Sequence, residues 1–345
     1  MNDMIDWSTI HQAYVYGFSY RKFLILKKFI PNTKLKRVAK LSEIPVQSVI
    51  VVWGMAPLTG FEEKHCTLVR VEDGFLRSIG LGAALTQPVS WVFDDCGMYF
   101  NTQQVSRLEK VLNGSLWSRE LLTRAAQIQT DLIQNKLSKY NLLNVQVDFP
   151  DISDRKKILV IGQVEGDASL EYGSPAIKKN IELLETVYKA NSQDYILYRP
   201  HPDVVSGWRT DSLAYDRANL LCNKISAEGN ILDWIEWADE IHVMTSLTGF
   251  EALIRGKKVY CYGLPFYSGW GLTQDYLASP REKRTLTLLE LIAGTLIVYP
   301  RYRSISKKNT CGQMQVEDAI KELSTMQPKD ESFLIRCLKP FLRRD

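Results

Sequence analysis

Short apolar runs alternate with polar, glycine-containing turns along the first half of the chain, and this pattern predicts strands followed by helices. Three buried strands are expected, at 47–53, 67–71 and 89–93. Two helices are then expected, near 104–112 and from about 119 to 140. Residues 1 to about 45 instead alternate aromatic with basic residues, which predicts short helices with a solvated basic face.

The alternation resumes in the second half of the chain with stronger strand signals. Four buried strands are expected, at 158–162, 195–198, 240–244 and 258–262. Helices are expected at about 174–190, 231–237 and 250–255. Because strands that alternate with helices at this spacing indicate a parallel, doubly wound sheet, we predict an α/β protein.

A change of composition divides the chain into two such units. Residues 146–154 are largely polar and contain Pro150, so they are expected to link two domains. We predict Rossmann-like domains at 1–150 and 151–300 that face each other across a cleft. Ligands of open α/β sheets bind beyond the carboxyl ends of the strands, so the loops after the predicted strands are expected to line this cleft.

Composition and charge narrow the class of protein. With 345 residues, of which 45% are hydrophobic and 24% charged, the chain is typical of a soluble globular protein with room for two domains. The net charge of +4 is mild and does not indicate a nucleic-acid-binding protein. Six cysteines without CxxC spacing predict reduced thiols in a cytosolic protein rather than a zinc site. No apolar run has the length of a membrane span.

Two adjacent carboxylates, Glu72 and Asp73, follow the predicted strand 67–71. Successive side chains of a strand point to opposite faces, so only one of the two is expected to face the cleft. Gly74 is expected to let the chain leave the strand sharply through a positive φ, and Arg77 is a candidate partner for a carboxylate. By itself, this stretch fits a carboxylate-capped turn equally well.

Two further loops at predicted strand ends carry side chains that suit a phosphorylated sugar. The candidate ligands are Gln163, Glu165, Ser169, Arg199 and His201. The first three offer amide, carboxylate and hydroxyl groups for a sugar or ribose. The imidazole, held between two prolines beside a guanidinium, forms a candidate phosphate grip. Solvated loop charges and a structural turn are the alternatives.

A fourth loop, 245–249, opens a predicted helix, where free backbone N–H groups and the helix dipole attract an anion. Ser246 and Thr248 add hydroxyl donors, although helix capping alone would explain them. Tyr267 and Trp270 are candidates for a lid or an acceptor contact, or else pack beneath one. Four such loops favour a single cleft for an anion and a sugar. The chain has neither a P-loop nor a GxGxxG motif, which argues against a P-loop kinase and a dinucleotide oxidoreductase.

Together, four motifs resemble those of the retaining β-Kdo transferases, the KpsC-type enzymes of Gram-negative capsule assembly and the related modules of O-antigen synthesis. The motifs are RVEDGFLRSIGLG (70–82), YRPHP (198–202), TSLTGFEAL (245–253) and YGLPFYSGWGLT (262–273). The resemblance covers roughly residues 47–280. It implies a GT-B glycosyltransferase fold, CMP-β-Kdo as donor, transfer of the acidic sugar Kdo with retention, and no metal or other cofactor.

The resemblance also implies roles for the candidate residues. Asp73 is expected to attack the anomeric carbon and form a Kdo–Asp73 intermediate, with Glu72 orienting it or serving as base. His201 is expected to donate a hydrogen bond to the phosphate of the leaving CMP, helped by Ser246 and Thr248. The other donor-binding candidates are Arg77, Gln163, Glu165, Ser169, Arg199, Gly249 and Glu251.

Two of these candidates have a more specific expected contact. Glu251 is expected to hydrogen-bond the ribose. Either Arg77 or Arg199 is expected to bind a phosphate or the Kdo carboxylate bidentately, and the sequence leaves open which one does so.

The expected partners are CMP-Kdo, a glycan or lipid-linked acceptor and other polysaccharide-assembly enzymes, with no nucleic acid. We expect a cytoplasmic protein with a peripheral contact to the inner face of the inner membrane. The apolar and basic segment 333–344 is a candidate for that contact. Alternatively, it belongs to a C-terminal helical segment, 301–345, that packs back on the first domain.

Two other functions stay open. An inverting CMP-sialic acid transferase would use Asp73 as a general base, and a non-catalytic sugar- or nucleotide-binding module would release no CMP. KpsC-type proteins usually carry two modules in tandem, whereas this chain has room for one, which leaves the acceptor and the linkage open.

Overall fold

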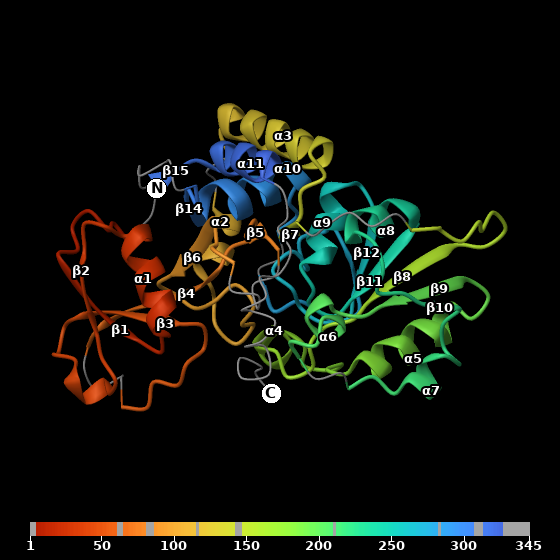
Figure 1. The fold of residues 1–345 in the computed structure, drawn as a ribbon, viewed down its shortest axis with the longest axis horizontal. Helices are drawn as coiled ribbons and strands as arrows, with labels where there is room; N and C mark the ends of the chain where they lie inside the picture. Colours follow the sequence, from red (N-terminus) through yellow and green to blue (C-terminus); the bar gives the residue numbers. More distant parts are fainter. Residues whose placement is uncertain are drawn as a thin grey trace.

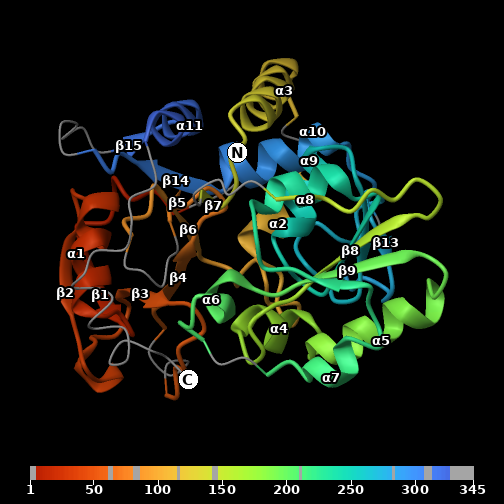
Figure 2. The same ribbon diagram turned by 45° about the vertical axis from the view of Figure 1, so that its right-hand side comes forward.

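The computed structural model describes residues 5–60, 65–80, 86–114, 117–141, 147–209, 212–281, 284–306 and 313–326. It contains two large β-sheets that lie beside each other, with helices packed on their faces (Figure 1). The N-terminal part of the chain builds most of the first sheet, and the middle of the chain builds the second. A view turned by 45° keeps the two sheets on opposite sides of the molecule (Figure 2).

The first sheet has seven strands in the order β15-β14-β6-β4-β3-β1-β2. They are β1 (Gln12–Tyr16), β2 (Lys34–Arg37), β3 (Val49–Trp53), β4 (Thr67–Asp73), β6 (Ser90–Asp94), β14 (Pro300–Arg303) and β15 (Gln313–Met314). Strands β1 to β4 run parallel, whereas β6, β14 and β15 are joined antiparallel. The expected fully parallel sheet is therefore wrong for this half. A parallel β4–β6 pair would need a long crossover, and the described residues between them hold only the short strand β5 (Ser78–Ile79).

The second sheet has six strands in the order β10-β9-β8-β11-β12-β13, and all neighbouring pairs are parallel, as predicted. They are β8 (Lys157–Ile161), β9 (Tyr195–Arg199), β10 (Lys224–Ile225), β11 (Glu240–Val243), β12 (Lys258–Cys261) and β13 (Gln274–Asp275). Ile158, Leu159 and Val160 are fully buried, because both faces of the sheet are covered.

Helices cover these sheets. They are α1 (Tyr20–Phe29), η1 (Leu41–Glu43), α2 (Arg107–Asn113), α3 (Arg119–Gln134), α4 (Ala168–Gly173), α5 (Asn180–Ala190), α6 (Pro202–Val205), α7 (Tyr215–Ala218), α8 (Ile231–Trp237), α9 (Thr248–Ile254), α10 (Leu288–Ile292), η3 (Ala293–Val298) and α11 (Val316–Thr325). The predicted helix 174–190 starts only at Asn180, and α4 begins inside the predicted loop 163–169. In the described part of the chain, no helix has the length and apolarity to cross a membrane.

Two of the short helices expected before residue 45 are present, as α1 and η1, but the strands β1 and β2, which were not predicted, flank α1 and form a β-α-β unit with it. Strand β1 lies inside the sheet between β2 and β3, so Ala13 and Val15 are fully buried. Helix α1 packs Phe23, Ile25, Leu26 and Phe29 against this sheet and leaves Lys27 and Lys28 exposed.

Helix α3 ends at Gln134, well before the predicted end near residue 140. Lys136 has a φ of 48°, the left-handed conformation in which many helices terminate. The following residues run into the short strand β7 (Tyr140–Asn141), which pairs with β5. This early end brings Lys139 and Tyr140 to the cavity between the two sheets.

After η3 the chain returns to the first sheet. Strand β14 pairs with β6, and α11 packs on α3, where Arg124 and Glu317 form an ion pair of 2.9 Å. The sequence predicts only helix for this segment, but β14 and β15 add two strands. The apolar and basic stretch 333–344 lies outside the described residues.

One apolar cluster continues across both halves of the molecule. The ring of Phe75 packs against that of Phe266, with centroids 4.7 Å apart, and Phe266 lies 5.3 Å from Phe250 on α9. At the same boundary, Glu251 Oε1 accepts a hydrogen bond of 2.8 Å from the backbone N–H of Lys139. These contacts fasten the two halves together beside the cavity.

Candidate active site

A cavity of about 1330 Å³ lies between the two halves, at the carboxyl ends of β4, β8, β9 and β11. The sequence-predicted residues that border it are Glu72, Asp73, Arg77, Gln163, Ser169, Arg199, His201, Ser246, Thr248 and Glu251. The ends of parallel strands are the usual ligand sites of α/β proteins, so the fold brings these residues together where a ligand is expected.

Both carboxylate oxygens of Asp73 accept hydrogen bonds from buried side chains. Arg77 Nε donates to Oδ2 at 2.7 Å, and Trp91 Nε1 donates to Oδ1 at 3.0 Å. Trp91 stands opposite Asp73 on the antiparallel strand β6. Arg77 in turn donates to the hydroxyls of Ser78 and Thr86, at 3.0 and 2.9 Å. The carboxylate of Asp73 therefore has one fixed orientation at the edge of the cavity.

The pKa values of the two adjacent carboxyl groups shift in opposite directions. Burial alone would raise the pKa of Asp73, but the positive charges of Arg77 and Lys139 outweigh it and hold the pKa below its usual value. Burial and the negative charge of Asp73 raise the pKa of Glu72 to about 7. Near neutral pH, Asp73 is therefore ionised, whereas Glu72 is present in both its protonated and its ionised form.

Both carboxyl groups border the cavity, so the expectation that only one would face it is wrong. The side chain of Glu72 folds back along the strand, where its Oε1 accepts a hydrogen bond of 3.0 Å from the backbone N–H of Asp73. Both residues are still paired with β6, so it is this bend of the Glu72 side chain that lets both carboxyl groups border the cavity.

Gly74 also has a different role from the one predicted. Its φ is not positive, and a Cβ atom at this position would lie 2.2 Å from Ser90 Oγ. The glycine is required for the close approach of β6, the strand that carries Trp91, rather than for a left-handed turn.

Two lysines that the sequence reasoning missed face the carboxyl groups. Burial alone would lower the pKa of Lys139, but the nearby Tyr140 and Asp73 raise it, so this lysine is charged. Lys22 Nζ lies 3.2 Å from the centroid of the Trp53 ring, and both residues border the cavity. The predicted end of α3 hid Lys139, and only the alternation of basic and aromatic residues before position 45 pointed to Lys22.

His201 precedes α6 and caps it. Its Nδ1 accepts a hydrogen bond of 3.1 Å from the backbone N–H of Asp203. Burial lowers the pKa of His201, so the ring is neutral at physiological pH. Since Nδ1 is the acceptor, the single ring proton belongs on Nε2, which makes that nitrogen a donor for a ligand in the cavity.

The guanidinium groups of Arg77 and Arg199 do not match the expected anion grip. Arg77 is paired with Asp73. The terminal nitrogens of Arg199 donate to the carbonyl oxygens of Glu228 and Gly229, at 2.6 Å each, and its burial lowers its pKa to about 10. Arg199 therefore shapes the wall formed by residues 227–230.

The loop 245–249, which carries the hydroxyl groups and is called the hydroxyl loop below, is held in place by Gln163. The amide of Gln163 donates to Thr245 Oγ1 at 3.0 Å and accepts from the backbone N–H of Thr245 at 2.8 Å. Ser246 Oγ accepts a bond of 3.3 Å from the N–H of Thr248. Both hydroxyl residues border the cavity beside the first turn of α9, where Glu251 lies.

Four predicted residues do not border the cavity: Glu165, Gly249, Tyr267 and Trp270. Glu165 accepts a hydrogen bond of 2.8 Å from the backbone N–H of Asn180.

Tyr267 and Trp270 are completely buried. The hydroxyl of Tyr267 donates to the Ser246 carbonyl, and Gly249 provides the space for that ring. The interpretation of the two aromatic residues as a lid or acceptor contact is therefore wrong, because they support the hydroxyl loop from below.

One group of potential metal ligands occurs among the described residues: Asp94, Asp95 and Cys96. The carboxylate of Asp94 already accepts hydrogen bonds from the backbone N–H of Gly97 and the hydroxyl of Tyr299, both at 2.8 Å. Asp95 pairs with Arg107 at 2.7 Å. These hydrogen bonds and this ion pair already engage the carboxylates of Asp94 and Asp95, so the group does not fit a metal site.

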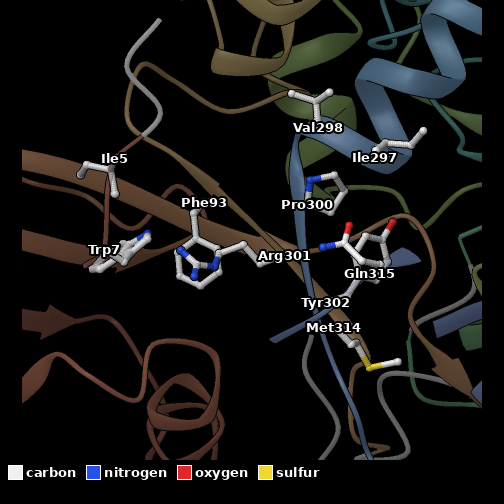
Figure 3. Close-up of a pocket in the computed structure, with 10 residues that line it drawn as sticks. All are labelled: Ile5, Trp7, Phe93, Ile297, Val298, Pro300, Arg301, Tyr302, Met314 and Gln315. Atoms are coloured by element: carbon white, nitrogen blue, oxygen red, sulfur yellow. The ribbon is translucent and has the colours of Figure 1, made fainter. Parts of the chain in front are cut away.

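A second, smaller cavity of about 220 Å³ lies between the N-terminal segment and β14 (Figure 3). It is lined by Ile5, Trp7, Phe93, Ile297, Val298, Pro300, Arg301, Tyr302, Met314 and Gln315. None of these described residues is a carboxylic acid or a histidine, so this cavity lacks groups for acid–base chemistry. The larger cavity is the candidate active site.

Two neighbouring β-sheets, with a carboxylate pair on one wall of the cavity and a histidine and hydroxyl loop on the other, define an α/β protein with a large polar cavity between its sheets. A family model described as capsule polysaccharide biosynthesis protein matches residues 50–302. The chain belongs to this family.

Curated relatives share much of the sequence. The chain is 46% identical over 301 residues to the capsule polysaccharide modification protein LipA of Neisseria meningitidis serogroup A, covering 84% of this chain and 43% of LipA. It is 41% identical over 260 residues to the lipopolysaccharide-processing protein LpsZ of Rhizobium meliloti, covering 73% of this chain and 59% of LpsZ. The chain therefore spans about half the length of these relatives.

Two solved structures of KpsC from Thermosulfurimonas dismutans are similar over nearly the whole chain. The one described as a β-Kdo 2,7 transferase is 37% identical, with a TM-score of 0.75, and the match covers 91% of this chain and 98% of that chain. The one described as a β-Kdo 2,4 transferase is 30% identical, with a TM-score of 0.78, and the match covers 90% and 97%.

Proposed function

We propose that this chain is a GT-B transferase that moves Kdo with retention of configuration from CMP-β-Kdo to a glycan or lipid-linked acceptor, in capsule or O-antigen synthesis. Membership of the capsule family and the likeness to the KpsC transferases support this. The observation that carries the proposal is the carboxylate of Asp73, which is ionised and fixed through both oxygens at the edge of the cavity.

In the first step, an oxygen of Asp73 attacks the anomeric carbon of Kdo, and the bond from that carbon to the phosphate oxygen of CMP breaks. The electron pair leaves with CMP. His201 Nε2–H and the hydroxyls of Ser246 and Thr248 hydrogen-bond the phosphate as its negative charge grows. The product is an ester between Kdo and Asp73.

In the second step, the acceptor hydroxyl attacks the same carbon, its proton passes to Glu72, and Asp73 leaves as a carboxylate. Two inversions give net retention. A pKa of about 7 suits Glu72 to this proton transfer, whereas the lowered pKa of Asp73 suits a nucleophile. Lys139 and Lys22 balance the charge of the two carboxylates.

We further propose a cytoplasmic site of action at the inner face of the inner membrane, together with other polysaccharide-assembly enzymes, because a lipid-linked acceptor would be held there.

The proposal is tested by incubating the chain with CMP-β-Kdo and candidate acceptors. We expect CMP release, a covalent Kdo adduct on Asp73 by intact mass, and a β-linked product. Asp73→Asn is expected to lower transfer by at least about a thousandfold and to form no adduct. Full activity of this variant would refute double displacement at Asp73. A preference for CMP-sialic acid with inverted product would favour the sialyltransferase alternative, and no CMP release would favour a binding module.

A further inference from the structure

Positive charge is concentrated at the N-terminal end of the chain. Residues 7–60 contain eight basic residues and one acidic residue, Glu43, so this part has a net charge of +7. The whole chain has only +4, so the remainder is net negative, at −3. The basic residues are Arg21, Lys22, Lys27, Lys28, Lys34, Lys36, Arg37 and Lys40. The mild total therefore hides a strong separation of charge.

The fold gathers these residues at one end of the molecule. Helix α1 and the edge strand β2 lie together at the outer end of the first sheet, on the left in both views (Figures 1 and 2). Lys27 and Lys28 on α1 are exposed, as are Lys34, Lys36 and Arg37 on β2. No described carboxylate forms an ion pair with any of these five residues.

The outer face of α1 also exposes apolar side chains. Tyr20 is 64% exposed and Leu24 is 42% exposed. They lie one turn apart, so they share the helix face that Lys27 and Lys28 flank, opposite the buried Leu26. An exposed face that combines lysines with an aromatic and an aliphatic side chain is typical of helices that bind at a lipid–water interface.

We propose that the outer face of α1, with β2, is a docking surface for an anionic lipid bilayer. Its cations match the negative surface of such a bilayer, and Tyr20 and Leu24 provide apolar groups that a purely electrostatic partner such as a nucleic acid would not need. Arg21 and Lys22 on the same helix border the large cavity, so α1 connects the proposed docking surface to one wall of that cavity. The basic face expected to be merely solvated thereby acquires a partner.

Co-sedimentation of the full chain with vesicles tests this surface. We expect binding to vesicles of phosphatidylcholine mixed with phosphatidylglycerol, little binding to pure phosphatidylcholine, and a decrease as salt is added. Each lost cation is expected to weaken partitioning by about fivefold, so K27E/K28E should abolish measurable binding. Tyr20→Ser with Leu24→Ser should weaken it several-fold at unchanged net charge.

The matched control is K189E/K258E, which makes the same change in net charge with two exposed lysines of the second half. It should bind anionic vesicles as the unmodified chain does. The proposal is overturned if the chain does not bind these vesicles at low salt, if K27E/K28E binds normally, or if both double variants lose binding equally. Tight RNA binding without vesicle binding would also overturn it. The assay needs no sugar donor, so its outcome is independent of the transferase proposal.

Discussion

The cavity has two walls, one around Asp73 (the first wall) and one around His201 and Ser246 (the second wall). On the first wall polar side chains hydrogen-bond to one another, whereas on the second they hydrogen-bond to the backbone. On the first wall, Arg77 and Trp91 donate directly to the carboxylate. On the second, His201, Gln163 and Arg199 each bind main-chain groups. We infer that charge sets the reactivity of the first wall and that backbone geometry sets the binding properties of the second.

The largest expected effect beyond Asp73 itself comes from Glu72. Glu72→Gln should lower transfer by about a thousandfold, because the second step loses its base. Transfer by the unmodified chain should rise as the pH passes about 7, since Glu72 must lose its proton to act. In the variant this rise should vanish, and the Kdo adduct should accumulate in intact mass spectra. If the pH dependence persists unchanged, Glu72 is not the base.

A change on the second wall should have a smaller effect. His201→Asn keeps a side-chain acceptor for the Asp203 N–H but removes the Nε2 donor. We expect transfer to fall by about a hundredfold, with slower CMP release and an unchanged melting temperature. The comparison of the walls breaks down if this variant unfolds at lower temperature yet retains its rate.

Trp91→Phe tests the first wall without removing a charge. The variant loses the hydrogen bond to Asp73 Oδ1 while keeping a ring to stack on Phe29. We expect about a tenfold lower kcat, because one bond to a charged group is lost. Since that bond favours the ionised carboxylate, the pKa of Asp73 should rise, so the rate of adduct formation, a step that does not use Glu72, should begin to fall at a higher pH on acidification. A profile that stays in place would mean that Arg77 alone determines the state of Asp73.

The smallest effect is expected for Tyr267→Phe, which removes the buried hydroxyl below Ser246. The free energy of unfolding should fall by about 1 kcal/mol. The KM for the donor should rise a few-fold at constant kcat, because the hydroxyl loop is less well supported. A large loss of kcat that depends on the acceptor would instead restore the lid interpretation of Tyr267.

The sequence predicts the second half well because its strands are buried on both faces and pair with neighbours in a regular parallel order. The positions of His201 and the hydroxyl loop follow from that local pattern. The first wall depends on contacts between distant segments. Trp91 reaches Asp73 only because β6 is antiparallel to β4, and Lys139 is placed by a helix end at Lys136 that no glycine or proline marks. The loop sequence around Tyr267 favours an accessible side chain, but the ring is buried in space that Gly249 leaves free.

The aromatic packing of Phe75, Phe266 and Phe250 bears on how such a protein can be cut and recombined. The polar stretch before β8 resembles a convenient place to exchange one half for another. A cut there would expose these rings to water, and it would also separate β6 from β14, which the chain contributes more than 200 residues later. Grafts between related chains should therefore replace surface loops and keep β14 and β15 together with the N-terminal strands of the first sheet.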